Sequence, residues 1–348
     1  MRAFFFLVLP AFFSVSAYAQ YNSDNLKVEN LSAEKKLAYK NLRVYPIRAN
    51  SDFIKAHKDL GNYTTLKEAM EKKQIIITEK VNQPTPANTN TNLQNTRSGR
   101  NVSINENGVV NTLYAENTSK DTIILMAGEV VTGGKQDRVL AADIVLPPNS
   151  GKVELSVFCV EHGRWSTKSS GYQFNGYFNV SSANVRKNAV VKKDQQEVWK
   201  EVEVTRVKNK EVSKMNNPNQ AYNTTDAYAD IAADTTYNNT LNEYLTYFGA
   251  LFQSDTTIIG VVAATGDTII GCDMFATHIL FRKQYPNLIQ SYITEATTNG
   301  GEVKISDEKV QQYVANILSD ESKQEEKVKQ NGEMLKTKTN KKLHIATF

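Results

Sequence analysis

Residues 257–275 read TIIGVVAATGDTIIGCDMF and give the clearest indication of fold in this chain of 348 residues. Two apolar runs rich in β-branched residues, 257–264 and 268–275, flank a short turn around Gly266. Such runs, joined by a turn that contains glycine, are typical of a β-hairpin. We therefore expect a hairpin at the centre of the C-terminal half.

Helical patterns surround the predicted hairpin. Apolar residues recur there at three- and four-residue spacing, which indicates amphipathic helices. Pro286 predicts a break or a new first turn inside one of them, and Ser306 predicts the N-cap of another. Two short β patterns, 333–337 and 343–348, close the chain and are expected to complete a sheet. The predicted helices cover 194–208, 241–252, 278–296 and 306–318.

A period of two residues dominates the N-terminal half. Turn signals such as Gly133-Gly134 separate its short strands, and Thr64 or Thr65 predicts the N-cap of a short helix. Closely spaced strands with short turns indicate an antiparallel sandwich or barrel. The predicted fold is α+β: an antiparallel β-rich N-terminal half packed with a C-terminal half of helices around the hairpin and the closing strands. The predicted strands cover 41–47, 74–79, 109–116, 122–131, 139–146 and 152–161.

The rest of the chain suggests one domain with flexible parts. Residues 20–40 are polar and are predicted to form a flexible N-terminal segment. The β-rich part is expected at 41–165, and the helical and hairpin part of the same domain at 166–348. Within them, the Asn/Thr-rich stretch 82–100 has almost no apolar content and predicts a disordered insertion. Residues 166–193 are rich in Ser, Gly and Asn and predict a long loop.

The first 19 residues have the features of a targeting segment. Residues 1–19 combine a positive charge at Arg2, an apolar run and a small-residue cleavage pattern, Ala-Tyr-Ala. This combination predicts a signal peptide and therefore an exported protein, periplasmic or extracellular. A single membrane anchor is the alternative, but the run is shorter than the roughly 20 apolar residues that span a bilayer. No later run approaches that length, so we expect no membrane span.

Composition argues against several partners. Lys plus Arg number 41 against 37 Asp plus Glu, a balance too weak for a typical nucleic-acid-binding protein. The four histidines are scattered and no paired Cys/His spacing occurs, so we expect neither a metal site nor a cofactor. In an exported protein, Cys159 and Cys272 either form a disulfide or remain two buried thiols, and both alternatives stay open.

The densest polar stretch is AGEVVTGGKQDR at 127–138. It does not match a phosphate-binding loop, because a glycine occupies the lysine position and a strand, not a helix, is predicted to follow. A glycine turn that presents Lys135 and Arg138 suits an anion. Pairing of these cations with Glu129 and Asp137 would instead make an internal network.

A second polar stretch, CVEHGRW at 159–165, ends a predicted strand. Glu161 lies at the end of an apolar row, where a carboxylate needs a partner, and Arg164 is the natural one. A structural ion pair capped by Trp165 is the alternative to a binding site here. Asp273, near the end of the hairpin, is either a site residue or a helix cap.

Together these stretches resemble a bacterial domain family, the ARG/rhodanese-phosphatase-associated protein (ARPP) domain. The resemblance spans residues 40–348, and Val130 departs from it, because an acidic residue often follows Glu129 in the family. Gene context links some relatives to ADP-ribosylglycohydrolases, so the resemblance implies a role near NAD or ADP-ribose metabolism. It implies no established activity. The stretches that carry the resemblance are 128–129, 134–140, 159–165, 196–199, 259–262, 271–275, 280–283 and 343–346.

The leading functional hypothesis is an exported binding or accessory module for a small anionic or polar ligand, nucleotide-like or sugar. Cationic side chains would neutralise the ligand and Trp165 would stack on it. Two other functions stay open: a hydrolase in which Glu129 or Glu161 is the general base with Asp273 nearby, and an envelope structural or interaction protein. One open cleft shared by the polar groups would favour a site, and a closed, dry ion-pair network would favour a structural role. The predicted ligand-binding residues are Lys135, Gln136, Asp137, Arg138, Arg164 and Trp165.

Overall fold

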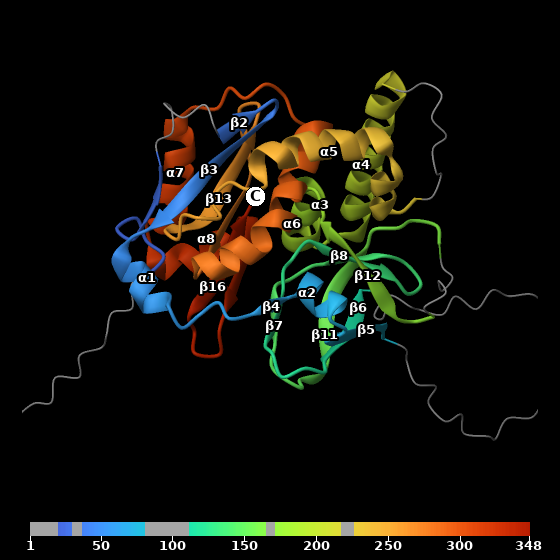
Figure 1. The fold of residues 1–348 in the computed structure, drawn as a ribbon, viewed down its shortest axis with the longest axis horizontal. Helices are drawn as coiled ribbons and strands as arrows, with labels where there is room; N and C mark the ends of the chain where they lie inside the picture. The colour runs from blue at the N-terminus through green and yellow to red at the C-terminus, as the bar shows by residue number, and fades with distance from the viewer. Residues whose placement is uncertain (1–19, 30–36, 81–110, 165–170, 217–225) are drawn as a thin grey trace, which may run out of the picture.

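The fold combines one large sheet with a β-rich lobe. In the described part of the chain, a seven-stranded sheet covered by helices lies beside a lobe built from two smaller sheets (Figure 1). The protein is therefore a mixed α+β fold with mainly antiparallel sheets, as predicted. The computed structural model describes residues 20–29, 37–80, 111–164, 171–216 and 226–348.

The predicted hairpin forms the centre of the large sheet. Strand β13 pairs antiparallel with β14 around the predicted turn, and its other edge pairs with β3 from the N-terminal half. Strand β16 lies between β14 and β15, so the closing strands complete this sheet, as predicted. In spatial order the described strands are β1 (Leu26–Val28), β3 (Leu42–Ala49), β13 (Ile258–Thr265), β14 (Thr268–Phe275), β16 (Lys342–Thr347) and β15 (Gly332–Lys336), with β2 (Ala38–Tyr39) paired to β3.

Helices cover both faces of the large sheet. On β3, Leu42 and Val44 face one apolar cluster, whereas Tyr45 and Ile47 face the other, since successive side chains of a strand point to opposite faces. The prediction that places this strand in the β-rich part at 41–165 is wrong, because a strand buried on both faces belongs in a covered sheet. Helices α5 (Thr235–Phe248) and α6 (His278–Thr298) pack on the first face, and α1 (Ser51–His57), α7 (Asp307–Leu318) and α8 (Glu321–Asn331) pack on the second.

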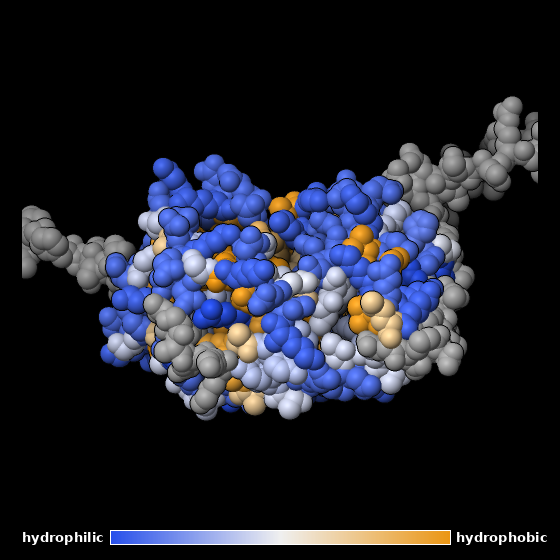
Figure 2. All heavy atoms as spheres, turned by 90° about the horizontal axis from the view of Figure 1, so that it is seen from above, coloured by the Kyte–Doolittle hydropathy of each residue, from blue (hydrophilic) through white to orange (hydrophobic). Residues whose placement is uncertain are grey.

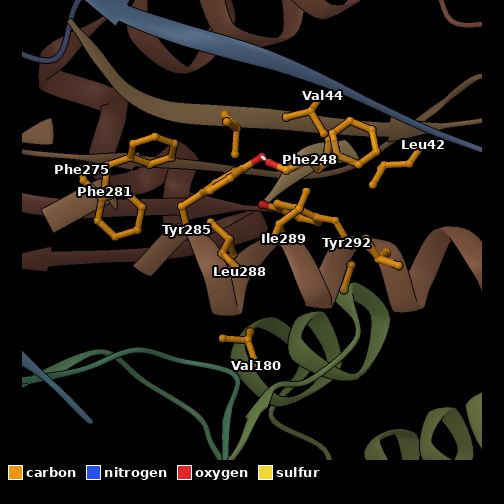
Figure 3. Packing of buried hydrophobic residues seen from close by; sticks show 14 of the residues in the cluster. Leu42, Val44, Val180, Phe248, Phe275, Phe281, Tyr285, Leu288, Ile289 and Tyr292 are labelled. Carbon is orange, nitrogen blue, oxygen red and sulfur yellow. Dashed lines mark hydrogen bonds between the residues drawn. The ribbon is translucent and has the colours of Figure 1, made fainter. Parts of the chain in front are cut away.

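Helix α6 is buried on two sides. Figure 3 shows Tyr285, Leu288 and Tyr292 pointing from the helix toward the large sheet, while Val180 of the β-rich lobe lies on the opposite side. The helix continues through Pro286, so the predicted break is wrong. Burial between two layers stabilises the helix despite the backbone hydrogen bond that proline cannot make.

The β-rich lobe contains a six-stranded sheet that curls toward closure. Its first and last strands approach each other, because Thr78 forms an antiparallel bridge with Gln173, next to β12. The predicted barrel-like arrangement is confirmed in this sense. In spatial order the six strands are β12 (Phe174–Val180), β8 (Glu129–Gly133), β9 (Arg138–Leu140), β11 (Gly151–Cys159), β6 (Thr112–Asn117) and β5 (Ile75–Glu79); the three-stranded sheet is β10 (Ile144–Leu146), β7 (Ile123–Leu125) and β4 (Thr64–Thr65).

Two predicted strands are each divided between the small sheets. The run at 122–131 forms β7 and β8, and the run at 139–146 forms β9 and β10, so neither is a single strand. The break between β7 and β8 ends at Gly128. This residue has a φ of 92°, which glycine adopts readily and other residues rarely do. A Cβ at this position would lie 2.5 Å from Cγ of Arg186. The break therefore depends on a close approach that only the folded chain creates.

A helical layer follows β12, where a long loop at 166–193 is predicted. That prediction is wrong for its described part, because Val185 and Ala189 are buried against the six-stranded sheet. The helix predicted at 194–208 is confirmed and extends further. The layer contains α3 (Ala183–Lys187), the π-helical turn η2 (Asn188–Lys192), α4 (Gln195–Asn216) and the 3-10 helix η3 (Tyr228–Ala233).

The described N-terminal residues are part of the fold. Strand β1 pairs antiparallel with β3, and Tyr21 and Leu26 are buried in the cluster on the second face of the large sheet. The prediction of a flexible segment at 20–40 is therefore wrong for these residues. Two large apolar side chains and a short ladder anchor an otherwise polar stretch.

Three predictions concern residues that the structure does not describe. The signal peptide predicted at 1–19, the disordered insertion predicted at 82–100 and Trp165 lie outside the described residues. Among the described helices, none is both long enough and apolar enough to cross a membrane.

Helix α2 (Leu66–Glu71) begins with a capping box that decides between the two predicted N-caps. The Thr65 hydroxyl accepts from the Glu68 amide at 3.3 Å, and the Glu68 carboxylate accepts from the Thr65 amide at 2.9 Å. Glu68 also pairs with Lys283 of α6 at 3.3 Å, which ties this helix to the layer beneath the large sheet.

We expect Thr65→Ala to lower the free energy of unfolding by about 1 kcal/mol, because the Glu68 amide loses the hydroxyl oxygen that accepts its hydrogen bond. Thr246→Ala, on the exposed side of α5, is the control and should change stability by less than about 0.5 kcal/mol. Urea unfolding of both variants measures the difference. Equal costs would mean that the box does not stabilise α2.

Candidate functional site

Four charged side chains meet between the large sheet and the β-rich lobe. Asp143 precedes β10, Arg186 lies on α3, Asp273 on β14 and His344 on β16. All four are buried. The pairing of β14 with β16 places His344 opposite Phe275, so it shares a face with Asp273 two residues away. The topology thus brings together residues that are far apart in the sequence.

Hydrogen bonds connect these groups into a chain. Arg186 binds Asp273 with both Nη atoms, at 2.7 and 3.0 Å. His344 Nε2 lies 2.9 Å from the same carboxylate, and its Nδ1 lies 2.5 Å from Asp143 Oδ2. Tyr292 donates its hydroxyl to Asp273. We refer to the chain Asp143–His344–Asp273–Arg186 as the interlobe network.

Opposite charges within the interlobe network outweigh burial and set the pKa values of Asp273 and His344. Burial would raise the pKa of Asp273, but Arg186 and His344 outweigh burial and hold that pKa well below its usual range. Burial would lower the pKa of His344, but Asp143 and Asp273 raise that pKa to about 9. At neutral pH Asp273 is therefore ionised and His344 mainly protonated, and together with the permanently charged Arg186 they compensate one another, which is how buried charges are tolerated.

Glu129 lies beside the interlobe network and is fully buried. Its carboxyl group accepts from the Met126 amide at 2.7 Å and from the Tyr177 hydroxyl at 3.1 Å. Burial raises the pKa of Glu129 to about 8, against these two hydrogen bonds. The group is therefore mainly protonated at neutral pH, which does not suit the general base of a hydrolase.

A second network closes the glycine turn of the β-rich lobe, and we call it the turn network. Arg164 binds the Glu161 carboxylate with Nε at 2.6 Å and with Nη2 at 2.5 Å. Its Nη1 donates to the Gly134 carbonyl at 3.0 Å. The Asp137 amide donates to Glu161 at 3.1 Å, and the Asp137 carboxylate accepts from the Gly133 amide at 3.0 Å. Both ends of the turn are thus bonded internally.

The buried side chain of Arg138 completes the turn network. It is fully buried, and its Nη1 donates to the Gln136 carbonyl at 2.6 Å. Its Nη2 lies 3.5 Å from Glu79 Oε2, and the other oxygen of Glu79 accepts from the Lys135 amide at 2.8 Å. Arg138 is thus paired internally, but its partners are Glu79 and the Gln136 carbonyl and not Glu129 or Asp137, which the internal alternative named.

The structure divides the predicted site residues between the two networks. Glu129 and Asp273 lie together near Arg186, whereas Glu161 lies in the turn network. Most of these residues are buried, and Lys135 and Arg164 retain partial exposure. The candidate groups therefore do not line one open cleft. The predicted ligand-binding residues found in the turn network are Lys135, Gln136, Asp137, Arg138 and Arg164.

The two cysteines are separate thiols. Cys159 lies on β11 of the β-rich lobe and Cys272 on β14 of the large sheet, both buried and free. The disulfide alternative is therefore wrong, because the two strands belong to different sheets. Burial raises the pKa of the Cys159 thiol to about 11 and that of Cys272 above its usual range, so neither is a reactive thiolate at neutral pH.

The face that carries β2, α5 and α4 is mainly hydrophilic, with small, separate apolar areas (Figure 2).

A groove elsewhere on the surface adjoins the interlobe network. The groove lies between the loop before α2, strand β10 and the β15–β16 hairpin, with a volume of about 600 Å³. Tyr63, Val145 and Leu335 supply apolar walls, and Asp143 links the groove to the network.

Three members of the interlobe network escape prediction from sequence. Arg186 falls in the predicted loop, and Asp143 falls inside a predicted single strand. His344 does carry a signal, because a histidine in an apolar closing strand needs a buried partner. That signal does not identify the partner, since Asp143 and Asp273 come from other parts of the chain.

Comparisons with known proteins identify one family. The model of the ARG and Rhodanese-Phosphatase-superfamily-associated Protein domain matches residues 30–346. The match covers both networks and nearly all of the described chain. Comparison with curated proteins and with solved structures found no match to either.

Proposed function

The chain belongs to the family of ARG and Rhodanese-Phosphatase-superfamily-associated Protein domains, and from this premise we propose that it is a binding module for a small polar ligand. The ligand site in this proposal is the groove between β10 and the β15–β16 hairpin. One observation carries the proposal: a groove of about 600 Å³ combines apolar walls with convergent polar groups. Ligand sites typically have 300–1,000 Å³ and this mixed lining.

The interlobe network joins the two walls of the groove, which favours a groove that is already formed before a ligand binds. Asp143 belongs to the β-rich lobe and His344 to the large sheet, and their 2.5 Å contact joins the two walls. Because Asp273 and Arg186 continue the chain of charges, separating the lobes would expose or unpair several buried ions. A preformed site loses less entropy when a ligand binds.

The carboxylates support binding rather than hydrolysis. Glu129 and Asp273 are fully buried, and Glu161 is held by Arg164. A general base needs to reach a proton of its substrate. The apparent signal peptide at 1–19 supports an exported location, periplasmic or extracellular, for this binding module.

Blocking the groove tests the proposal. We expect Asn62→Trp to abolish ligand binding, because this exposed loop residue lines the groove and an indole would fill it. A thermal-shift screen against nucleotides, ADP-ribose, NAD, sugars and short peptides supplies the ligand. A ligand at 100 times its Kd adds about 2.7 kcal/mol, which is easily measured. Calorimetric titration of the variant then measures the loss.

Two further variants make this result interpretable. Asn242→Trp, on the exposed side of α5, should bind like the parent. Arg164→Ala removes one of the two partly exposed cationic residues of the turn network. If Arg164→Ala remains folded and loses the ligand while Asn62→Trp keeps it, the ligand site is the turn network and the groove is not the site.

A further inference from the structure

We infer that the ligand of the groove is an extended peptide, which adds to the outer edge of β15 as a further strand. This inference rests on the proposed function, because it names the ligand class of the same groove. In the described part of the chain, β15 is the last strand of the large sheet and β10 is the last strand of the three-stranded sheet. Both contribute residues to the groove.

The two edge strands meet at one end of the groove. Glu333, near the start of β15, forms a hydrogen bond with the backbone of Asp143, the residue before β10. The lining of the groove includes Val145 and Pro147, from β10 and the loop after it, and Lys336 and Lys338, from β15 and the turn after it. The groove therefore opens between two strand edges.

A strand edge presents unpaired backbone N–H and C=O groups, which another extended chain can satisfy. This is the recognition mode of domains that bind peptides by strand addition, where backbone bonds give affinity and side-chain pockets give specificity. Apolar walls at Tyr63, Val145 and Leu335 suit alternate apolar side chains of such a peptide. A compact ligand would leave the edge groups of β15 unused.

The charges of the groove favour a peptide over a phosphate-rich ligand. Lys336 is already paired with Glu325, and Asp143 with His344. The exposed charged groups that remain in the lining are Lys338 and Asp59, one of each sign. A groove with no net excess of cations does not suit a polyphosphate.

A peptide matches this balance of charge. Its backbone is neutral, and one acidic side chain pairs with the exposed Lys338 ammonium group in the groove lining. The sequence preference expected from the lining is alternating apolar residues with an acidic residue at the Lys338 end. Asp59 on the lining disfavours a second acid and favours a basic or neutral group.

The test uses short synthetic peptides that alternate valine with one variable residue, titrated into the whole protein. We expect peptides with glutamate to bind, and methylation of backbone nitrogens to weaken binding at every second position. Methylation at positions that pair with β15 should raise Kd at least about tenfold, since it removes a hydrogen bond and adds a clash. Methylation at the positions between them should change Kd little.

Charge reversal at Lys338 tests the acidic preference. We expect Lys338→Glu to raise the Kd of the glutamate peptide about fivefold and to improve binding of the matching lysine peptide. The variant should stay folded because Lys338 is exposed. Lys304→Glu reverses an exposed charge outside the groove lining and should leave both Kd values unchanged.

The outcomes separate this inference from the proposed function. Binding without a two-residue methylation pattern overturns strand addition. Binding of a nucleotide or sugar but of no peptide, lost in Asn62→Trp, overturns the inference and leaves the groove as the site. If no compound in either panel binds the parent protein, both the inference and the proposed function fail.

Discussion

Asp273→Asn is expected to lower the free energy of unfolding by about 3–5 kcal/mol, the cost of leaving a buried charge without its partner. Asparagine keeps the shape of the side chain but removes the charge that balances Arg186. The guanidinium cannot deprotonate in response. His344 also loses one of its two carboxylates. Urea unfolding, followed by circular dichroism, measures the change.

Two variants show whether the cost comes from the unpaired cation. Asp255→Asn removes a half-exposed carboxylate that pairs with Arg48, and should cost no more than about 1 kcal/mol. Combining Asp273→Asn with Arg186→Met should recover part of the lost stability, because the uncompensated charge is then absent. If Asp273→Asn costs no more than Asp255→Asn, the interlobe network does not hold the two lobes together.

Stability is expected to fall by at least about 3 kcal/mol between about pH 6 and pH 9. The folded pKa of His344 is about 9, above its ordinary value of 6.5, so its contribution is complete below about pH 6.5 and is lost as the pH rises to 9. The folded pKa of Glu129 is about 8, above its ordinary 4.5, so its contribution is also lost as the pH rises. Both groups therefore act in the same direction.

Glu129→Gln separates the two contributions to this pH dependence. The amide imitates the protonated carboxyl, so the variant should lose less stability than the parent when the pH is raised from about 6 to about 9. The remaining decrease then reports on His344 together with Glu333, whose pKa is raised by burial to about 7. Denaturant unfolding at several pH values measures both slopes. A free energy of unfolding that is flat or rises over this range would show that neither pKa is shifted upward in the folded protein.

Local signals in the sequence were sufficient for much of the fold. The hairpin at 257–275 and the cap at Thr65 are confirmed because β-branched runs, a glycine turn and a capping box each act within a few residues. The break at Gly128 and the helix at α3 were missed, since both depend on contact with distant elements. Helix α8 was missed for a related reason, because its surface is mostly polar and its burial comes from docking.

The candidate site was less predictable than the fold. Sequence reasoning correctly paired Glu161 with Arg164, because they lie three residues apart at the end of one strand. It could not assemble the interlobe network, since Asp143, Asp273 and His344 come from three separate segments. The groove escaped prediction altogether, because edges of two different sheets line it and no local pattern marks a sheet edge.

The partnership of β3 with β13 has a consequence for how the chain acquires its structure. Their paired residues are more than two hundred positions apart, and the strands of the β-rich lobe lie between them in the sequence. The intervening lobe is rich in nearer pairings and can form while the nascent chain is still being made. The large sheet has to wait for its last strands, so high contact order predicts slow completion and a long-lived intermediate in which β3 is not yet paired with β13.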